Sequence, residues 1–179
     1  VGYQASGIIK QVGDRVTDRH VGDRVVATMA FGSHAELASV PAGSTYLLPA
    51  SLSFESAAGV PIEFGTAADC LFEFGHLQPG ETVLVQAGGG GVGLAAIQLA
   101  KRAGATVLAT ASSDDKLERL KSFGLDHGIN YRTEDFVART MELTAGRGAN
   151  LIVDSVGGKT LEGSVAALAY RGRISWVGN

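Results

Sequence analysis

The stretch that decides the fold is Thr82-Val-Leu-Val-Gln-Ala-Gly-Gly-Gly-Gly-Val-Gly93. Its first half, 82–87, is a short run of β-forming apolar residues, and four consecutive glycines follow it at once. From Gly91 the apolar residues recur at helical spacing to about Ala103. Strand, glycine turn and helix in this order are typical of the first half of a βαβ unit that binds a dinucleotide.

The glycine cluster contains the G-x-G-x-x-G pattern at Gly88, Gly90 and Gly93. Glycines allow the backbone to turn sharply and to approach a pyrophosphate, whose charge is then met by the unpaired N–H groups at the helix start. Four consecutive glycines match many patterns, however. The alternative interpretation is a flexible glycine-rich turn between a core strand and a core helix.

The composition is that of a globular protein with a sizeable core. Hydrophobic residues make up 45% of the 179 residues and charged residues 18%. The net charge of −3 and the lack of a basic cluster argue against a nucleic-acid partner. No apolar run approaches the roughly 20 residues of a membrane span and no signal peptide opens the chain, so we expect a cytoplasmic protein. A single cysteine, Cys70, excludes an internal disulfide and a cysteine-rich metal site.

The first third of the chain is rich in β-forming residues. Its pattern predicts short strands at 6–11, 24–30 and 33–40, and a short extended stretch at 45–48. A helix follows from Ser53 and is interrupted or restarted at Pro61. We therefore place a domain boundary near Pro61, with one domain at 1–62 and a second at 63–179. Because the chain begins with Val1 and stops as a strand finishes, we expect an internal piece of a longer protein.

Beyond the glycine turn, strands and helices alternate regularly. The pattern predicts strands at 105–110, 129–131, 150–154 and 173–177, and helices at 114–123, 136–143 and 160–169. This alternation predicts an α/β domain, a Rossmann-type doubly wound parallel sheet. With 82–87 the sheet has five strands where the complete fold has six, so we expect the last strand to be missing.

The end of the second strand of this domain indicates which dinucleotide fits. An NAD protein usually offers an acid there, about 20 residues past the first glycine, to bind the ribose 2′-hydroxyl. Here the strand runs into Ser112 and Ser113, and Lys116 follows within the first helical turn. Small hydroxyls and a cation suit a 2′-phosphate, which favours NADP. Alternatively, a serine only caps the helix, the acids Asp114 and Asp115 only complement its dipole, or one of those acids turns back to the ribose and reverses the preference.

Taken together, these motifs make the chain similar to the zinc-independent quinone oxidoreductases, the zeta-crystallin-like branch of the medium-chain dehydrogenase/reductase superfamily. The order and spacing of short segments carry the resemblance over nearly the whole chain. They are Val21-Gly-Asp-Arg-Val25, the expected strand at Ala35-Glu36, Leu48-Pro49, Gly65-Thr-Ala67, Leu77-Gln-Pro-Gly-Glu81, Gly90-Gly-Val-Gly93, Ala111-Ser-Ser113 with Lys116, Leu125 onward to Asn130-Tyr131, and Asp154-Ser-Val-Gly157. The resemblance implies part of a GroES-like substrate domain followed by a Rossmann domain, both incomplete.

The resemblance also implies a cofactor-binding role for nine residues. Gly90, Gly91 and Val92 would lie along the pyrophosphate, Ser112, Lys116 and Tyr131 around the 2′-phosphate, and Thr66, Val156 and Val177 around the nicotinamide. Two of these have plain alternatives, since Tyr131 also suits a core position and the Thr66 hydroxyl also suits a bond to its own backbone. No catalytic acid or base is implied.

The start of the chain departs from the zinc-dependent relatives. Those proteins carry Gly-His-Glu-x-x-Gly, whereas this chain reads Gly2-Tyr-Gln-Ala-Ser-Gly7. The metal-binding histidine is replaced, and we expect no metal. Gln4 also departs from the glutamate usual in the zinc-free branch, and the sequence offers no reason for that change.

The resemblance implies NADPH-dependent hydride transfer to a quinone or an α,β-unsaturated carbonyl, by a homodimer that pairs near the edge strand at 173–177. Two alternatives stay open. One is an enoyl reductase of the same superfamily, and the other is an NADPH-binding protein with a structural or regulatory role and no catalysis.

Overall fold

The computed structural model describes residues 1–178 and divides into two compact units, Val1–Gly65 and Thr66–Asn179. The first unit is β-rich and the second alternates strands with helices. The assignment of 1–62 to a GroES-like domain and of 63–179 to a dinucleotide-binding domain stays a prediction, because compactness alone does not identify a domain.

The first unit is built on a small antiparallel sheet in the order β1-β2-β3. Its elements are β1 (Gln4–Ile8), β2 (Arg24–Thr28), a 3₁₀ turn η1 (Ala42–Ser44), β3 (Thr45–Leu47) and helix α1 (Phe54–Ala58), with Ser53 as the N-cap. The predicted strand at 33–40 is wrong. The Gly32 and Ser33 amides bond to Val1 and Gly2, but the segment after them forms no ladder among residues 1–178. A β-forming sequence becomes a strand only where a partner strand accepts its hydrogen bonds.

The Gln4 side chain joins β1 to the start of helix α2 (Pro61–Ala68) by hydrogen bonds. These bonds explain why a glutamine suits this position. Its side-chain oxygen accepts a 2.8 Å hydrogen bond from the Ile62 amide, one of the N–H groups without a partner in the first helical turn. Its amide nitrogen donates to the carboxylate of Glu63. A glutamate at position 4 would bring two carboxylates together, whereas the neutral amide supplies both the donor and the acceptor.

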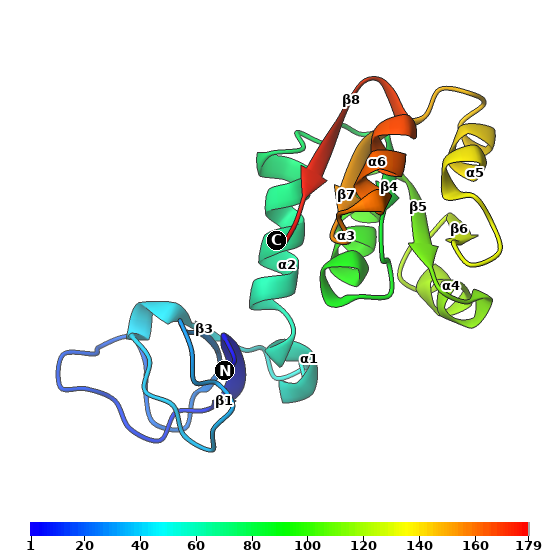
Figure 1. Cartoon of the computed structure of the whole chain (residues 1–179). Helices are drawn as coiled ribbons and strands as arrows, with labels where there is room; N and C mark the ends of the chain where they lie inside the picture. The colour runs from blue at the N-terminus through cyan, green and yellow to red at the C-terminus, as the bar shows by residue number, and fades with distance from the viewer. Residues whose placement is uncertain (179) are drawn as a thin grey trace. The chain divides into compact units, whose positions relative to one another are not determined.

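The second unit is a five-stranded parallel sheet in the order β6-β5-β4-β7-β8, as Figure 1 shows. The strands are β4 (Thr82–Val85), β5 (Thr106–Ala111), β6 (His127–Asn130), β7 (Ala149–Asp154) and β8 (Leu168–Trp176). Helices α3 (Gly91–Arg102) and α4 (Asp114–Lys121) alternate with them, as do α5 (Phe136–Leu143) and α6 (Lys159–Ala166). The Rossmann-type sheet predicted from the sequence is confirmed, and each predicted strand lies within a few residues of its expected place.

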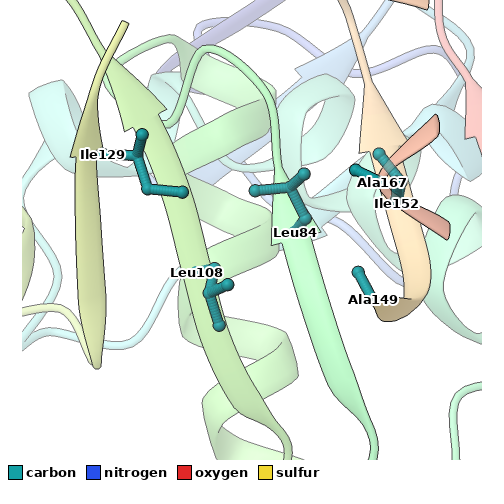
Figure 2. Packing of buried hydrophobic residues seen from close by; sticks show 6 residues of the cluster. All are labelled: Leu84, Leu108, Ile129, Ala149, Ile152 and Ala167. Carbon is teal, nitrogen blue, oxygen red and sulfur yellow. The ribbon is translucent and has the colours of Figure 1, made fainter. Parts of the chain in front are cut away.

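Helices cover both faces of this sheet, so its three central strands, β4, β5 and β7, are buried along nearly their whole length. Helices α3 and α4 contact β4, β5 and β6, and helices α5 and α6 contact β6, β7 and β8. Figure 2 shows a cluster of buried residues from neighbouring strands: Leu84, Leu108, Ile129, Ala149 and Ile152, joined by Ala167 after α6. Phe136 and Val137 of α5 pack against this cluster. Alternate residues of β4, Val83 and Val85, are also fully buried, which is typical of a parallel strand between two helical layers.

Helix α2 ends in a π-helical turn, η2 (Asp69–Glu73). The Phe74 amide donates to the Asp69 carbonyl at 2.9 Å, five residues back. Gly75, which follows this turn, has a steric role. A Cβ on Gly75 would lie 2.3 Å from the carbonyl oxygen of Cys70 and 2.8 Å from that of Leu71, so the turn closes only around a glycine.

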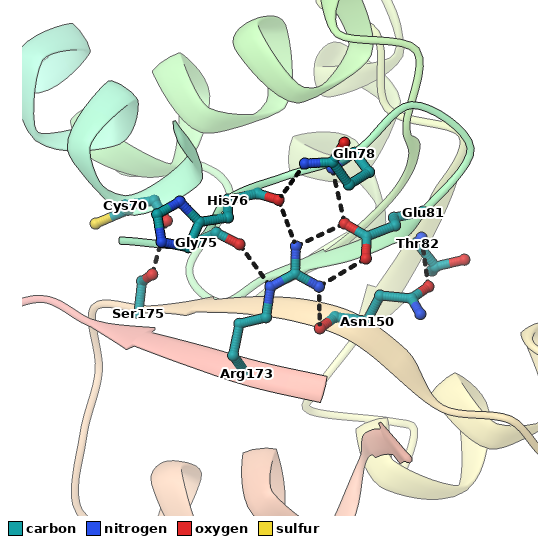
Figure 3. Close-up of polar contacts among 9 residues, drawn as sticks. All are labelled: Cys70, Gly75, His76, Gln78, Glu81, Thr82, Asn150, Arg173 and Ser175. Carbon is teal, nitrogen blue, oxygen red and sulfur yellow. Dashed lines mark hydrogen bonds and ion pairs between the residues drawn. The ribbon is translucent and has the colours of Figure 1, made fainter. Parts of the chain in front are cut away.

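Arg173 of β8 joins the amino ends of the strands through all of its donor groups (Figure 3). Its two terminal nitrogens pair with the two carboxylate oxygens of Glu81 at 2.7 and 2.6 Å. Its Nε donates to the Gly75 carbonyl at 2.5 Å, and the terminal nitrogens also donate to the carbonyls of Asn150 and His76, both at 3.1 Å. A bidentate ion pair with every N–H engaged is the strongest form of this contact.

The Arg173 guanidinium, by its hydrogen bonds, holds the pKa of Glu81 below its ordinary value of 4.5. A lowered folded-state pKa stabilises the fold above the unfolded pKa, and this stability is lost as the pH falls through the folded pKa. We therefore expect Glu81→Gln to lower the free energy of unfolding by about 1–2 kcal/mol at neutral pH. The difference from wild type should shrink as the pH falls below the unfolded pKa of 4.5 and through the lower folded pKa, measured by urea unfolding followed by circular dichroism.

The matched control is Glu118→Gln, which removes an exposed ion pair with Lys121 on α4. Exposed pairs contribute little, so its effect should stay within about 0.5 kcal/mol at neutral pH. An equal loss in both variants, or a loss from Glu81→Gln that does not depend on pH, would contradict the role assigned to the Arg173 contact.

Candidate functional site

The sequence-predicted site residues of the second unit gather at the carboxyl edge of the sheet. Each of them except Thr66, which lies on α2, follows one of the parallel strands, and the carboxyl ends of parallel strands share one edge. In strand order these positions are Tyr131 after β6, Ser112 after β5, the glycine turn 88–93 after β4, Val156 after β7 and Val177 after β8. From β4, the strands β5 and β6 lie on one side and the strands β7 and β8 on the other, so the strand order reverses between β4 and β7. Open α/β sheets bind ligands at the carboxyl edge beside such a point.

Two glycines of the turn permit close packing between β4 and α3. A Cβ on Gly93 would lie 2.4 Å from the Ala87 carbonyl oxygen and 2.8 Å from Gly88 Cα. A Cβ on Gly88 would lie 2.8 Å from Ala109 Cβ on the neighbouring strand. Both contacts are shorter than real Cβ atoms make, so a side chain at either position would push the helix away from the sheet.

Three other glycines, Gly89, Gly90 and Gly91, are exposed on the outer side of the turn. Gly90 is the N-cap of α3, with extended backbone angles (φ −83°, ψ 169°) and no side-chain cap bond. The amides of Gly91, Val92 and Gly93 open the helix, and such amides have no acceptor within their own helix. Since unpaired N–H groups and the positive end of the helix dipole coincide here, the turn is a ready anion site.

Lys116 places a positive charge beside this turn. Its Cδ lies 3.8 Å from the position that a Cβ on Gly89 would occupy. Its Nζ donates to Ser112 Oγ at 3.2 Å. The structure thus brings Lys116, Ser112 and the glycine turn together, as the sequence interpretation requires of a phosphate subsite.

The serines, acids and tyrosine around the end of β5 have defined contacts in the structure. Ser113 is the N-cap of α4, but its side chain makes no cap hydrogen bond. Asp114 accepts a 2.9 Å hydrogen bond from Asn130 Nδ2. Tyr131 is 52% exposed and so is not a core aromatic, and its amide bonds to the Ala111 carbonyl at 3.2 Å. Tyr131 therefore lies beside the strand end that leads into Ser112.

Thr66 and Val177 line one groove of about 430 Å³, together with Asp69, Cys70, Phe74, Ile174, Ser175, Trp176 and Gly178. Val177 is held there by its amide, which bonds to the Asp154 carbonyl at 2.8 Å. The groove brings together two of the three residues predicted around the nicotinamide. Val156 is not part of its lining, and it is 54% exposed in the turn after β7.

A buried hydrogen-bond network lies directly under this edge, and no sequence motif predicts it. Thr110 Oγ1 donates to Gln86 Oε1 at 2.7 Å, and Gln86 Nε2 donates to Ser164 Oγ at 3.1 Å. Ser164 Oγ in turn donates to Asp154 Oδ2 at 2.8 Å. All four side chains are at most 2% exposed. The only sequence signal was a polar residue at or just beyond the end of three apolar strands, Gln86, Thr110 and Asp154.

The network holds both turns of the site. Thr110 Oγ1 accepts the Ala87 amide at 3.1 Å, and Ala87 has a positive φ of 53°, an unfavourable conformation for a residue with a Cβ. Asp154 Oδ1 accepts the amides of Val156 and Gly157, each at 2.9 Å. One continuous chain of bonds therefore links the glycine turn after β4 with the turn after β7.

Among residues 1–178 no three His, Cys, Asp or Glu side chains gather as a metal site would require. Cys70 is 6% exposed, and burial raises the pKa of its thiol, so the residue behaves as a small buried hydrophobe. In the same described range, no helix is both long enough and apolar enough to cross a membrane.

Comparisons with known proteins show the family to which this fold belongs. A family model described as zinc-binding dehydrogenase matches residues 91–179. Escherichia coli quinone oxidoreductase complexed with NADPH aligns over 97% of this chain and 54% of its own, with 36% identity and a TM-score of 0.90. This chain belongs to the medium-chain dehydrogenase/reductase superfamily. Within the superfamily it falls in the quinone oxidoreductase-like branch that the sequence motifs indicated.

Two further proteins resemble this chain over nearly its whole length. The Danio rerio protein named synaptic vesicle membrane protein VAT-1 homolog is 39% identical over 174 residues, which are 97% of this chain and 36% of the relative. CurK enoyl reductase is 37% identical, with a TM-score of 0.92, over 99% of this chain and 53% of its own. The chain thus spans about half or less of the length of the relatives it matches.

We expect the buried network to contribute to stability through its satisfied bonds. Ser164→Ala leaves Asp154 Oδ2 and Gln86 Nε2 each without this partner, which should cost about 2 kcal/mol of unfolding free energy. Thr140 on α5 is a matched control, because it is also fully buried and its hydroxyl has no hydrogen-bond partner in the described part of the chain. Thr140→Val should be neutral or stabilising by about 1 kcal/mol. Equal destabilisation by both variants in urea unfolding would show that the network adds nothing beyond burial.

The glycines of the turn should also separate into two classes. Gly93→Ala should destabilise the fold by about 1–3 kcal/mol, because the new methyl group meets backbone atoms that cannot move aside. Gly89→Ala should change stability by no more than about 0.5 kcal/mol, because its Cβ meets only the flexible Lys116 side chain, at 3.8 Å. Thermal unfolding of the two variants measures the difference. A Gly89→Ala variant as unstable as Gly93→Ala would contradict the packing described here.

Proposed function

We propose that this chain forms the NADPH-binding part of an oxidoreductase that transfers hydride to a quinone or an α,β-unsaturated carbonyl. The observation that carries the proposal is the placement of Lys116 and Ser112 beside the exposed glycines and the amides that open α3. A dinucleotide with an extra phosphate presents two anionic groups, and this edge of the sheet offers two cationic or amide-rich subsites.

The residues present fit such a cofactor sterically as well as electrically. Gly89, Gly90 and Gly91 are exposed and carry no side chain, so a pyrophosphate can approach the backbone amides directly. A Cβ on Gly90 would meet the Ala87 carbonyl oxygen at 3.3 Å, and one on Gly89 would occupy the space beside Lys116. A side chain at either position would therefore crowd the turn that we propose for the pyrophosphate.

The proposed roles follow from position along this edge. Gly90, Gly91 and Val92 would bind the pyrophosphate through their amides, and Ser112, Lys116 and Tyr131 would bind the 2′-phosphate. Thr66 and Val177, in their common groove, would hold the nicotinamide, with Val156 in the turn after β7. NADPH, when bound, supplies a hydride from its nicotinamide ring.

The acceptor is the less specific part of the proposal. A carbonyl-conjugated double bond or a quinone accepts hydride readily, so positioning by the protein contributes much of what such a reaction needs. The similarity to E. coli quinone oxidoreductase supports a quinone, and the similarity to CurK enoyl reductase supports an enoyl thioester. An NADPH-binding protein without turnover is the third candidate, because a fold does not establish an activity. A homodimer and a cytoplasmic location remain predictions.

Lys116→Ala tests the cofactor assignment. In the full-length protein we expect it to weaken NADPH binding by about ten-fold or more and to leave NADH binding nearly unchanged, because only NADPH carries the 2′-phosphate. Lys121→Ala on the same helix is the matched control, since Lys121 pairs with Glu118 and should not change either affinity. Calorimetric titration measures both affinities.

The same preparation decides among the acceptors. NADPH oxidation is followed with a quinone, a simple enone and an enoyl thioester as separate substrates. Turnover of the first two supports the proposal, and turnover of the thioester alone favours the enoyl reductase. Tight binding without any oxidation favours the non-catalytic protein, and no binding of NADPH would end the proposal.

A further inference from the structure

Helix α4 begins with two acidic residues, Asp114 and Asp115, immediately after Ser112 and Ser113. An acid near the end of the second strand is the group with which NAD proteins bind the ribose 2′-hydroxyl, and a carboxylate repels a 2′-phosphate. The chain therefore carries the cation that suits NADP and an acid that suits NAD within three residues of each other. The group that holds Asp114 in place then decides which of the two cofactors is preferred.

Asn130, the last residue of β6, restrains Asp114. Its Nδ2 donates to Asp114 Oδ1 at 2.9 Å, and its own side chain is only 6% exposed. Its Oδ1 accepts the Arg132 amide at 3.2 Å. Because a backbone amide can only donate, the Asn130 oxygen must face Arg132 and the nitrogen must face Asp114. The orientation of the amide is thus determined by its neighbours.

The backbone of Asn130 is equally well held. Its amide donates to Glu134 Oε2 at 2.9 Å, and its carbonyl accepts the amides of Thr133 and Glu134 at 3.0 and 2.9 Å. In the sheet it pairs with Ala111, the residue just before Ser112. The donor that binds Asp114 therefore has a defined position beside the strand end where the two cofactors differ.

We propose that Asn130 is a specificity-determining residue: by binding Asp114 Oδ1 it keeps this carboxylate from accepting the ribose 2′-hydroxyl, and so it favours NADPH over NADH. The inference rests on the proposed function and adds to it the residue that sets the cofactor preference. Asn130 acts through Asp114 and does not itself need to touch the cofactor. Lys116 attracts the 2′-phosphate of NADPH. Asn130 binds Asp114, the acid that would otherwise bind the ribose 2′-hydroxyl of NADH.

The test is a double-mutant cycle in the full-length protein, with NADPH and NADH affinities measured by calorimetry. Asn130→Ala should lower the NADPH-to-NADH affinity ratio by about ten-fold, because Asp114 loses a hydrogen bond to a charged group and becomes available to the ribose. In the Asp114→Ala background the same substitution should leave the ratio unchanged, since no acid remains to be released. If Asn130 had a purely structural role, Asn130→Ala would weaken the binding of NADPH and NADH equally, with or without Asp114→Ala.

Two further variants complete the design. Asn150→Ala is the matched control, because Asn150 accepts an amide hydrogen bond of 2.9 Å at the amino end of the strands, and the ratio should not change. Asn130→Asp keeps an acceptor for the Arg132 amide and so preserves that contact if the alanine variant fails to fold. It places a second carboxylate against Asp114, and it should also lower the ratio.

The failures of the two proposals are distinguishable. Wild-type protein that binds NADPH, together with a ratio that Asn130→Ala and Asn130→Asp do not move, overturns the inference about Asn130 alone. A ratio change that persists without Asp114 overturns it as well. Wild-type protein that binds neither nicotinamide cofactor overturns the proposed function and, with it, this inference.

Discussion

The close approach of α3 to the end of β4 is the constraint on which the second unit depends. A Cβ added to Gly93 or Gly88 would lie too close to backbone and side-chain atoms, so neither position has room for a side chain. Because the helix can lie this near the strand, its first amides emerge at the carboxyl edge of the sheet, beside Lys116. A side chain at either glycine would separate the amides from the cation, and the edge would lose its complementarity to a dinucleotide.

The two ends of the parallel sheet are secured in different ways, and the difference agrees with a site at only one of them. At the amino end, all the N–H groups of the Arg173 side chain donate, either to the Glu81 carboxylate or to one of three backbone carbonyls. No polar group of this side chain is therefore left to bind a ligand. At the carboxyl end the buried bonds from Thr110 to Asp154 lie one layer below the surface. They hold the turns in place, while the amides at the start of α3 have no acceptor within their own helix.

Neutral amides in the two units hold nearby acids in the same manner. Gln4 donates to Glu63 and accepts the Ile62 amide, and Asn130 donates to Asp114 and accepts the Arg132 amide. In each case one side chain satisfies a backbone N–H and a carboxylate at once, which neither an acid nor a base of the same size achieves. The glutamine that the sequence left without explanation thus has a physical reason.

Periodicity along the chain was a good guide wherever structure is local. The strands and helices after the glycine turn lie close to their expected positions, because alternation of apolar residues and helix caps are encoded by near neighbours. The segment 33–40 failed, since β-forming composition does not reveal whether a partner strand exists. Gly75 shows the same limit, because its close contacts with the carbonyls of Cys70 and Leu71 depend on a π-helical turn that no sequence pattern announced.

The sequence by itself determined the order of strand, glycine turn and helix, the missing acid at the tip of β5, and the presence of Lys116 one helical turn later. Only the tertiary structure decided which polar groups meet. Gln86 and Ser164 are 78 residues apart, Arg173 and Glu81 are 92 apart, and Asn130 and Asp114 are 16 apart. Such pairs depend on strand order and register, which arise from packing the whole sheet, and no local propensity contains them.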